Sequence, residues 1–153
     1  MTTVAANKTT IASDLQFTYG QTRFKGKTKI FEFPKEKAQF VLKTDRAYAG
    51  VSGNADQIAS LVEWLHDGEP HSKVPKLRNL ELLVLTGDGR LYLGKGLSAF
   101  LQVDEPFWAI GSGMDFAIGA MRQGATPLEA VKVAAKSDVN TGLGFQEFKL
   151  KEK

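Results

Sequence analysis

The sequence offers few side chains that can act as a catalytic nucleophile. It contains no cysteine and only two histidines, at positions 66 and 71, so neither a thiol nor a histidine-activated hydroxyl is the expected attacking group. Thr2 offers a self-contained alternative once Met1 is removed, because a free α-amine has a pKa of about 7.7 to 8.0 and lies within reach of its own hydroxyl. The small residue at position 2 permits that removal. Thr2 is therefore the candidate nucleophile of an acyl-transfer reaction, with its own amine as the base.

Two glycine motifs and the histidine pair do not predict a ligand site. Gly26-Lys27-Thr28 lacks the glycine that a phosphate-binding loop needs five positions earlier, where Gln21 stands. Gly111-Ser112-Gly113 is no dinucleotide fingerprint, because Phe116 occupies the position of the third glycine, and a tight turn before a helix is the simpler interpretation. The two histidines lack the spacing of metal ligands and fit a solvated loop better than a zinc site. We therefore expect no metal and no cofactor.

Composition indicates one globular domain that spans residues 1–153. The chain has 42% hydrophobic and 24% charged residues, which is ordinary for a single domain with a two-layer core. Its net charge of +3 comes from interspersed charges, and the basic stretch at residues 23–29 is typical of a solvated hairpin edge, so we expect no nucleic-acid partner. The chain starts without a signal-peptide pattern and has no apolar run long enough to span a membrane. We expect no membrane contact and a cytoplasmic location.

The first half of the sequence predicts strands followed by a helix. Four strands are expected, at residues 3–6, 9–14, 29–33 and 38–43. The first pair flanks the polar turn Asn7-Lys8 and the second pair flanks a charged turn at residues 34–37, whereas residues 15–26 are interpreted as irregular. Residues 54–66 predict an amphipathic helix, because apolar residues recur there at the spacing of one helix face, at Ile58, Leu61, Val62 and Leu65.

The second half predicts a hairpin, two helices and a last strand. The expected elements are a non-helical loop at residues 68–76, strands at 81–86 and 90–93 around Gly87-Asp88-Gly89, a helix from about 114 to 123, a helix from 127 to about 136 and a strand at 145–150. Thr126-Pro127-Leu128-Glu129 forms a capping box with proline at the first helical position, which marks the start of the second helix. This order of elements predicts a layered α+β protein in which helices cover antiparallel sheets.

Several short motifs gain meaning when they are taken together in chain order. They are Thr2-Thr3-Val4, Ile11-Ala12-Ser13-Asp14, Lys29-Ile30-Phe31, Ala49-Gly50-Val51-Ser52-Gly53, Ala109-Ile110-Gly111-Ser112-Gly113 and Ala134-Ala135-Lys136-Ser137-Asp138 with Thr141-Gly142. From residue 2 to about residue 150, this series resembles the proteasome β-subunits and the bacterial HslV peptidase. The resemblance implies the four-layer αββα sandwich of the N-terminal-nucleophile hydrolases. The second helix of that family is expected to be shortened or missing, because residues 67–78 offer only a proline-interrupted loop.

The resemblance also implies a role for each residue that matches a family motif. Thr2 Oγ would attack a peptide carbonyl while the α-amine takes and returns the proton. Lys29 would be a positive charge that keeps this amine neutral and favours ionisation of the hydroxyl. Asp14 would orient Lys29, and the backbone N–H of Gly50 would donate to the oxyanion. The polar network around the amine would be completed by Ser112, Asp138 and Thr141.

Three functions remain open at this stage. The first is the threonine-type endopeptidase core of a self-compartmentalising protease, a homo-oligomer of one or more rings that acts on peptides or unfolded proteins. The resemblance allows an AAA+ unfoldase as partner without requiring one. The second is a catalytically silent, self-assembling structural relative, which a retained Met1 would favour because it acylates the amine. The third is an amidase for small amides, since the same threonine and oxyanion donor serve any acyl transfer.

Overall fold

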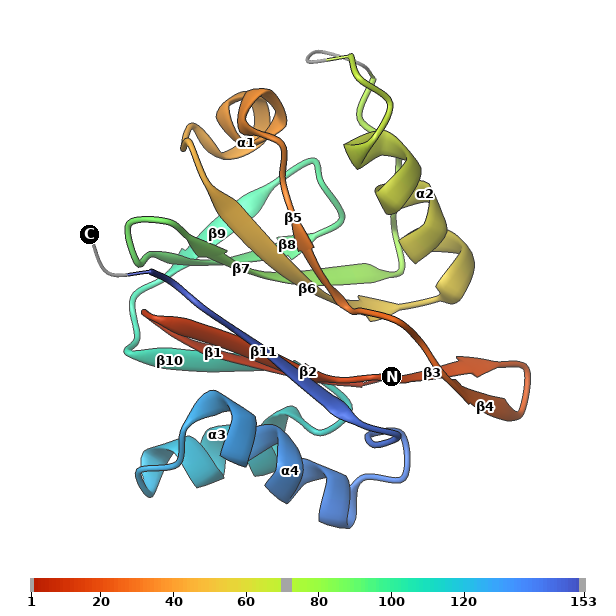
Figure 1. Cartoon of the computed structure of the whole chain (residues 1–153), viewed down its shortest axis with the longest axis vertical. Coiled ribbons are helices and arrows are strands. Elements are labelled where there is room, and N and C mark those ends of the chain that lie inside the picture. Colours follow the sequence, from red (N-terminus) through yellow and green to blue (C-terminus); the bar gives the residue numbers. More distant parts are fainter. Residues whose placement is uncertain (1, 70–72, 152–153) are drawn as a thin grey trace.

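The chain folds into four layers, with two antiparallel sheets stacked between two pairs of helices (Figure 1). The computed structural model describes residues 2–69 and 73–151. Helices α1 (Lys35–Leu42) and α2 (Ala55–Leu65) cover the outer face of one sheet, and α3 (Met114–Arg122) and α4 (Pro127–Ser137) cover that of the other. This is the α+β sandwich that the order of elements predicts.

The first sheet carries the N-terminus of the chain at its centre. Its order is β10 (Phe107–Gly111), β1 (Thr3–Asn7), β2 (Thr10–Asp14) and β11 (Phe145–Lys149). Thr3 lies opposite Gly111 in the β1–β10 pair. The side-chain oxygen of Asn7 accepts hydrogen bonds from the N–H groups of Thr9 and Thr10, which closes the turn between β1 and β2. The hairpin predicted at the start of the chain is therefore confirmed.

The second sheet contains the other predicted hairpin. Its order is β5 (Ile30–Glu32), β6 (Ala47–Gly53), β7 (Leu80–Thr86), β8 (Leu91–Lys95) and β9 (Phe100–Val103). The turn between β7 and β8 is held by the N–H of Arg90, which donates to Thr86 Oγ1 at 3.0 Å. A separate two-stranded hairpin, β3 (Gln16–Tyr19) with β4 (Thr22–Lys25), extends sideways from the sandwich (Figure 1).

Strand β1 is buried on both faces because its side chains alternate between two hydrophobic clusters. Val4 and Ala6 pack between the two sheets, together with Leu83 of β7. Ala5 points the other way and packs under α3 and α4 with Val131. Successive residues of a strand face opposite sides of the sheet, so β1 lies in the interior of the molecule, and Thr2 just before it is buried as well.

Residues 38–43, which the sequence predicted as a strand, fold differently. Residues 38–42 belong to helix α1, and Lys43 caps its end with a left-handed φ of +54°. Pro34 directly precedes the helix, and its Lys, Glu, Ala, Gln and Leu residues are good helix formers. The helix buries Lys37, whose Nζ lies 2.7 Å from Asp67 Oδ1 and 4.2 Å from the centre of a Trp64 ring. These contacts with the end of α2 are long-range and override the local pattern.

Residues 15–26, expected to be irregular, form the β3–β4 hairpin instead. Its turn contains Gly20 in the left-handed region, with φ +63°, and its aromatic residues Phe17 and Phe24 stack with ring centres 5.4 Å apart. Strands β9 and β10 were likewise not predicted. In contrast, the predicted helices at residues 54–66, 114–123 and 127–136 are confirmed as α2, α3 and α4.

The described residues between α2 and β7 contain no helix. Residues 67–69 and 73–78 are turns and irregular segments, so the helix that the resemblance would place here is absent from them. His71, which the sequence analysis considered with His66, lies outside the described residues. Within residues 2–69 and 73–151 no helix combines the length and the apolar run required to cross a bilayer.

Gly50 lies where β6 packs against strands β1 and β2 of the other sheet. It pairs with Ile30 on one side and Leu83 on the other, in the middle of the second sheet. A Cβ added at Gly50 would lie 2.3 Å from Val4 Cγ1 and 3.3 Å from Ile11 Cδ1. The absence of a side chain therefore lets β1 and β2 pack against β6.

Gly50→Ala is expected to lower the free energy of unfolding by about 1–3 kcal/mol, because the extra methyl group overpacks the contact between the sheets. The matched control is Gly119→Ala in the exposed face of α3, where an added Cβ meets nothing within 4 Å. That change should raise stability by up to about 1 kcal/mol, since alanine favours a helix over glycine. Urea denaturation of both variants measures the difference, and equal effects would contradict the packing role of Gly50.

Candidate active site

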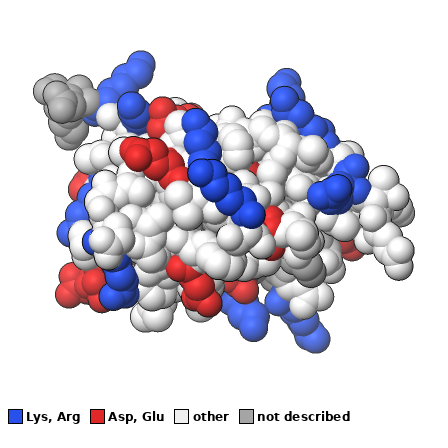
Figure 2. Space-filling model, turned by 90° about the horizontal axis from the view of Figure 1, so that it is seen from below, with Lys and Arg blue, Asp and Glu red and all other residues white. Residues whose placement is uncertain are grey.

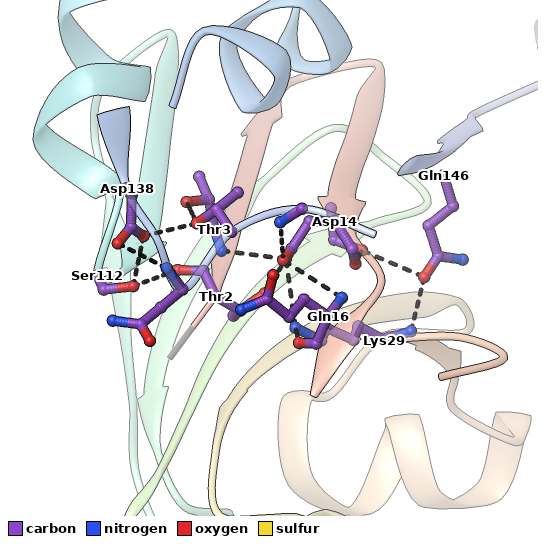
Figure 3. A network of polar contacts seen from close by, with 12 residues as sticks. Thr2, Thr3, Asp14, Gln16, Lys29, Ser112, Asp138 and Gln146 are labelled. Carbon is purple, nitrogen blue, oxygen red and sulfur yellow. Dashed lines mark hydrogen bonds and ion pairs between the residues drawn. The ribbon is translucent and has the colours of Figure 1, made fainter. Parts of the chain in front are cut away.

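The Thr2 hydroxyl is held between two charged side chains. Lys29 Nζ donates a hydrogen bond to Thr2 Oγ1, and Thr2 Oγ1 donates to Asp14 Oδ1 (Figure 3). Lys29 Nζ and Asp14 Oδ1 lie 3.3 Å apart. All three residues are buried, with exposed fractions of 1% for Thr2, 2% for Lys29 and 0% for Asp14. The structure therefore brings the predicted nucleophile, cation and carboxylate into direct contact.

Lys29 directly precedes β5, and its ammonium group has three hydrogen-bond acceptors. These are Thr2 Oγ1, Asp14 Oδ1 and the backbone oxygen of Gln16, and the Phe17 ring lies 4.9 Å from Nζ. Burial lowers the pKa of Lys29 below its ordinary value of 10.5, and the charge and hydrogen bond of Asp14 offset only part of this effect. Lys29 thus places next to the Thr2 hydroxyl a proton that is held less firmly than that of an exposed lysine.

Asp14 ends β2, and backbone N–H groups fix both of its oxygens. The N–H of Thr3 donates to Oδ1 at 3.2 Å, while the N–H groups of Gly142 and Gln16 donate to Oδ2 at 2.9 and 3.4 Å. Hydrogen bonds to a carboxylate are stronger than those between neutral groups. Because the donors come from separate segments of the chain, Asp14 is held in one orientation and in turn orients Lys29.

Ser112 and Asp138 lie on the other side of Thr2 (Figure 3), where they form a second polar cluster with Thr141. Ser112 Oγ and Thr141 Oγ1 each donate to Asp138 Oδ2 at 2.6 Å. Ser112 Oγ also donates to the backbone oxygen of Thr2 at 3.4 Å, and Thr141 Oγ1 lies 2.7 Å from Thr3 Oγ1. Burial raises the pKa of Asp138, but the hydrogen bonds from Ser112 and Thr141 outweigh it, so this pKa lies below 3.8. A carboxylate is thus anchored beside the backbone of Thr2.

Helix α4 and the end of β10 bring this second cluster to Thr2. Thr126 caps the start of α4 by accepting a hydrogen bond from the N–H of Glu129 at 3.2 Å, which confirms the predicted capping box. Helix α4 ends at Ser137, directly before Asp138. On the other side, Gly111 ends β10 with φ +96°, and an added Cβ there would lie 2.0 Å from the backbone oxygen of Thr2. Glycine at 111 therefore allows Ser112 to approach the start of β1.

The structure does not bring Gly50 to this site. The resemblance assigned its N–H to the oxyanion, but Gly50 lies between paired strands with its α-carbon against Val4 and Ile11. It does not line the cavity beside Thr2. The structure therefore places Gly50 away from the position that the expected role requires, and its lack of a side chain serves the packing of the two sheets.

Gly53, three residues further along β6, lines the cavity beside Thr2. The N–H of Val51 donates to the backbone oxygen of Lys29 at 3.1 Å, and N–H groups two residues apart in a strand point to the same side. The N–H of Gly53 therefore points to the same side, beyond Ile30, the first residue of β5, where Gly53 lines the cavity. An added Cβ at Gly53 would lie 2.3 Å from the backbone oxygen of Asn79. Only glycine fits there without a shift of the backbone.

A cavity of about 700 Å³ opens in front of Thr2 and Lys29. Its walls are formed by the β3–β4 hairpin, by the end of β6 with the start of α2, and by Val139 and Asn140 after α4. Cavities of this size commonly hold ligands with the bulk of a drug molecule. The cavity therefore has room for a short segment of peptide whose backbone reaches Thr2.

Gln146 of β11 is a further residue that sequence reasoning missed. Its side-chain oxygen accepts a hydrogen bond from the N–H of Lys29 at 2.6 Å (Figure 3). The same oxygen accepts one from Ser13 Oγ at 3.2 Å, and its Nε2 donates to Thr28 Oγ1 at 2.9 Å. One amide group thus ties the backbone of Lys29 to the residue before Asp14. A glutamine in an alternating strand carries no signal in the sequence that would reveal this role.

The arrangement suits activation of a hydroxyl. Thr2 Oγ1 faces a cation that stabilises negative charge on it and a carboxylate that accepts its hydrogen bond. In residues 2–69 and 73–151 no group of three or more His, Asp or Glu side chains is placed to hold a metal ion. Met1, whose removal would free the α-amine of Thr2, lies outside the described residues.

Comparison with known proteins gives matches in structure but not in sequence. No protein-family model matches the chain, and no curated protein matches it either. Solved structures match it over almost its whole length. The BPH of Thiobacillus denitrificans aligns with a TM-score of 0.69 at 16% identity over 99% of both chains. The eukaryotic HslV of Trypanosoma brucei aligns with a TM-score of 0.66 at 18% identity, over 98% of this chain and 99% of that one.

A third match is Anbu, described as an ancestral β-subunit, from Yersinia bercovieri. It aligns with a TM-score of 0.67 at 16% identity, over all of this chain and 88% of the other. Identities this low establish the fold and leave the chemistry to the residues themselves. The chain has the fold of the HslV and proteasome β-type N-terminal-nucleophile proteins.

Proposed function

We propose that this protein is a threonine-type peptidase that uses Thr2 as its nucleophile after removal of Met1. The observation that carries the proposal is the direct contact of the buried Thr2 hydroxyl with both Lys29 Nζ and the Asp14 carboxylate, on the wall of a cavity. Burial of the Lys29 ammonium group costs hydration that its hydrogen bonds offset only in part, so stability alone does not explain this contact. The arrangement does serve a nucleophile, because a cation at hydrogen-bond distance stabilises the alkoxide character that develops during attack.

The proposed reaction proceeds through an acyl-enzyme. Thr2 Oγ forms a bond with the substrate carbonyl carbon and its proton passes to the α-amine of Thr2, while the N–H of Gly53 donates to the oxyanion. The carbon–nitrogen bond then breaks and the amine returns the proton to the leaving nitrogen. Water, deprotonated by the same amine, hydrolyses the ester and restores the hydroxyl. Asp138, anchored beside Thr2, favours the transiently protonated amine.

We also propose that the chain works as a homo-oligomer that encloses its active sites and accepts peptides or unfolded proteins. A neighbour with the same fold, Anbu from Pseudomonas aeruginosa, is described as a helical assembly, which supports self-association of this fold. An AAA+ unfoldase is not part of the proposal, because the described residues after α2 lack the second helix that the resemblance implies.

Thr2→Ala should abolish peptide hydrolysis, by at least about 10³-fold, because it removes the nucleophile. The same variant should lose the covalent adduct with epoxomicin, a compound that the Thiobacillus denitrificans BPH binds in a solved complex. Intact mass before and after incubation shows both the loss of Met1 and the adduct. Thr22→Ala, at an exposed threonine of β4, is the matched control and should keep both. Retained Met1 with no adduct on the wild-type protein would refute the proposal.

The buried Lys29 predicts a specific dependence of stability on pH. Because burial holds its folded-state pKa below 10.5, the unfolded chain binds a proton that the folded chain has released, in the pH range between the two values. The free energy of unfolding should therefore gain a rising contribution as the pH increases through that range and reaches 10.5. This contribution should be missing in Lys29→Met. Urea denaturation at a series of alkaline pH values compares the slopes, and identical slopes would contradict the prediction.

Gln146→Leu should lower kcat several-fold while KM changes little, because it releases the backbone of Lys29 without altering the cavity wall. Loss of buried hydrogen bonds should also cost about 1–3 kcal/mol of stability. The matched control is Gln102→Leu, which makes the same change at an exposed position of β9. A variant of Gln146 that loses stability but keeps the wild-type kcat below its unfolding temperature would show that the residue is structural only.

A further inference from the structure

The cavity beside Thr2 has an unbalanced charge. Among the described residues that line it, Arg23 and Lys29 are charged and none is Asp or Glu. This positive bias is local to the cavity. The chain as a whole carries only +3, and acidic and basic side chains are mixed over the face that α3 and α4 cover (Figure 2). The positive charge of the cavity therefore comes from the residues that line it and not from the net charge of the chain.

Lys29 and Arg23 differ in whether their charge already has a partner. Lys29 already contacts Thr2, Asp14 and the Gln16 carbonyl and cannot serve a substrate charge as well. Arg23 stands on β4 of the protruding hairpin, paired with Thr18, and is exposed. In residues 2–69 and 73–151 no carboxylate forms an ion pair with Arg23. Its guanidinium is the charge at the cavity that remains available to a ligand.

The acidic residues of the site do not neutralise this charge. Asp14 has both oxygens engaged by Thr2, Lys29 and backbone N–H groups, and it is fully buried behind the nucleophile. Asp138 is engaged by Ser112, by Thr141 and by the N–H of Asn140. Neither residue lines the cavity.

We infer that the cavity selects peptides with an acidic side chain on the acyl side of the scissile bond, and that Arg23 is the residue that recognises this carboxylate. The inference rests on the proposed function and adds the substrate class. Arginine suits the task because its planar guanidinium binds a carboxylate through two parallel hydrogen bonds. The remaining wall has apolar groups from Val51, Ala55 and Ile58, against which the methylene groups of a glutamate can pack.

Matched fluorogenic peptides that differ only in the acyl-side residue test the inference. We expect kcat/KM for the glutamate peptide to exceed that for the isosteric glutamine peptide by about two- to fivefold, the range of an exposed ion pair, and to exceed that for the lysine peptide by more. The preference for glutamate over glutamine should weaken as salt is raised, because exposed charges are screened.

Arg23→Gln should remove the preference for glutamate, and Arg23→Glu should reverse it in favour of lysine. Lys25→Gln is the matched control, because Lys25 lies on the same strand, two residues along, and carries the same charge without lining the cavity. That variant should keep the preference. A preference lost equally in Lys25→Gln would mean that the general charge of the hairpin is responsible, and would overturn the role of Arg23.

Binding separates this inference from the proposed function. Fluorescence anisotropy on Thr2→Ala measures the affinity of the same labelled peptides without any turnover. Tighter binding of the glutamate peptide that disappears in Thr2→Ala with Arg23→Gln supports the inference even if the wild-type protein hydrolyses nothing. Hydrolysis of all three peptides at equal rates, or equal binding of all three, overturns the inference and leaves the nucleophile untouched.

Discussion

The burial of the Lys29 charge is the constraint on which the rest of the site depends. An ammonium group taken out of water loses several kcal/mol of hydration, and one carboxylate offsets this only with good geometry and further hydrogen bonds. Here the geometry is completed by Asp14, by the Gln16 carbonyl and by the Thr2 hydroxyl. Thr2, the proposed nucleophile, is thus one of the groups that satisfy the buried lysine, and the position of its hydroxyl follows from the same hydrogen bonds.

The sandwich supplies these groups from strands that only the tertiary fold brings together. Thr2 precedes β1 and Asp14 ends β2, and the β1–β2 turn at Asn7 fixes these two relative to each other. Lys29 belongs to the other sheet and needs a separate connection, which Gln146 provides from β11 at the edge of the first sheet. The last strand of the chain therefore takes part in placing a residue near its beginning, although it contributes no group to the cavity.

The sequence predicted those elements whose signals are local. The helix at residues 54–66 has a regular apolar face, and the helix after Thr126 has a capping box, so neither needs distant contacts to be recognised. Helix α1 was missed because the contacts that decide it, from Lys37 to Trp64 and Asp67, are made with another element. The β3–β4 hairpin was missed because it belongs to neither main sheet. Strand β4 is exposed along its whole length, so its residues show no alternation of buried apolar and exposed polar side chains.

The structure brings most of the expected site residues together, and the exception, Gly50, has a geometric cause. Side chains such as Asp14, Lys29, Ser112, Asp138 and Thr141 could be assigned from their order in motifs, because each carries its chemistry in its residue type. A backbone N–H donor cannot be recognised from residue type, because every residue except proline has one. Residues 50–53 contain two glycines, and each has a different structural reason. Gly50 allows the two sheets to pack closely. Gly53 lies beyond Ile30, the first residue of β5, where β6 has no paired strand on that side and the Gly53 N–H can serve as the proposed oxyanion donor.

The buried sandwich and the exposed hairpin differ in how well they tolerate amino-acid substitution. The nucleophile, Lys29 and Asp14 are locked into the buried sandwich, where a change of one group leaves another unsatisfied. Arg23 sits on an exposed hairpin that pairs with neither sheet, where substitutions of surface residues usually change stability by less than about 0.5 kcal/mol. The proposed selection of substrates can therefore change through the hairpin without disturbing the proposed chemistry, because Arg23 lies in an exposed part of the fold.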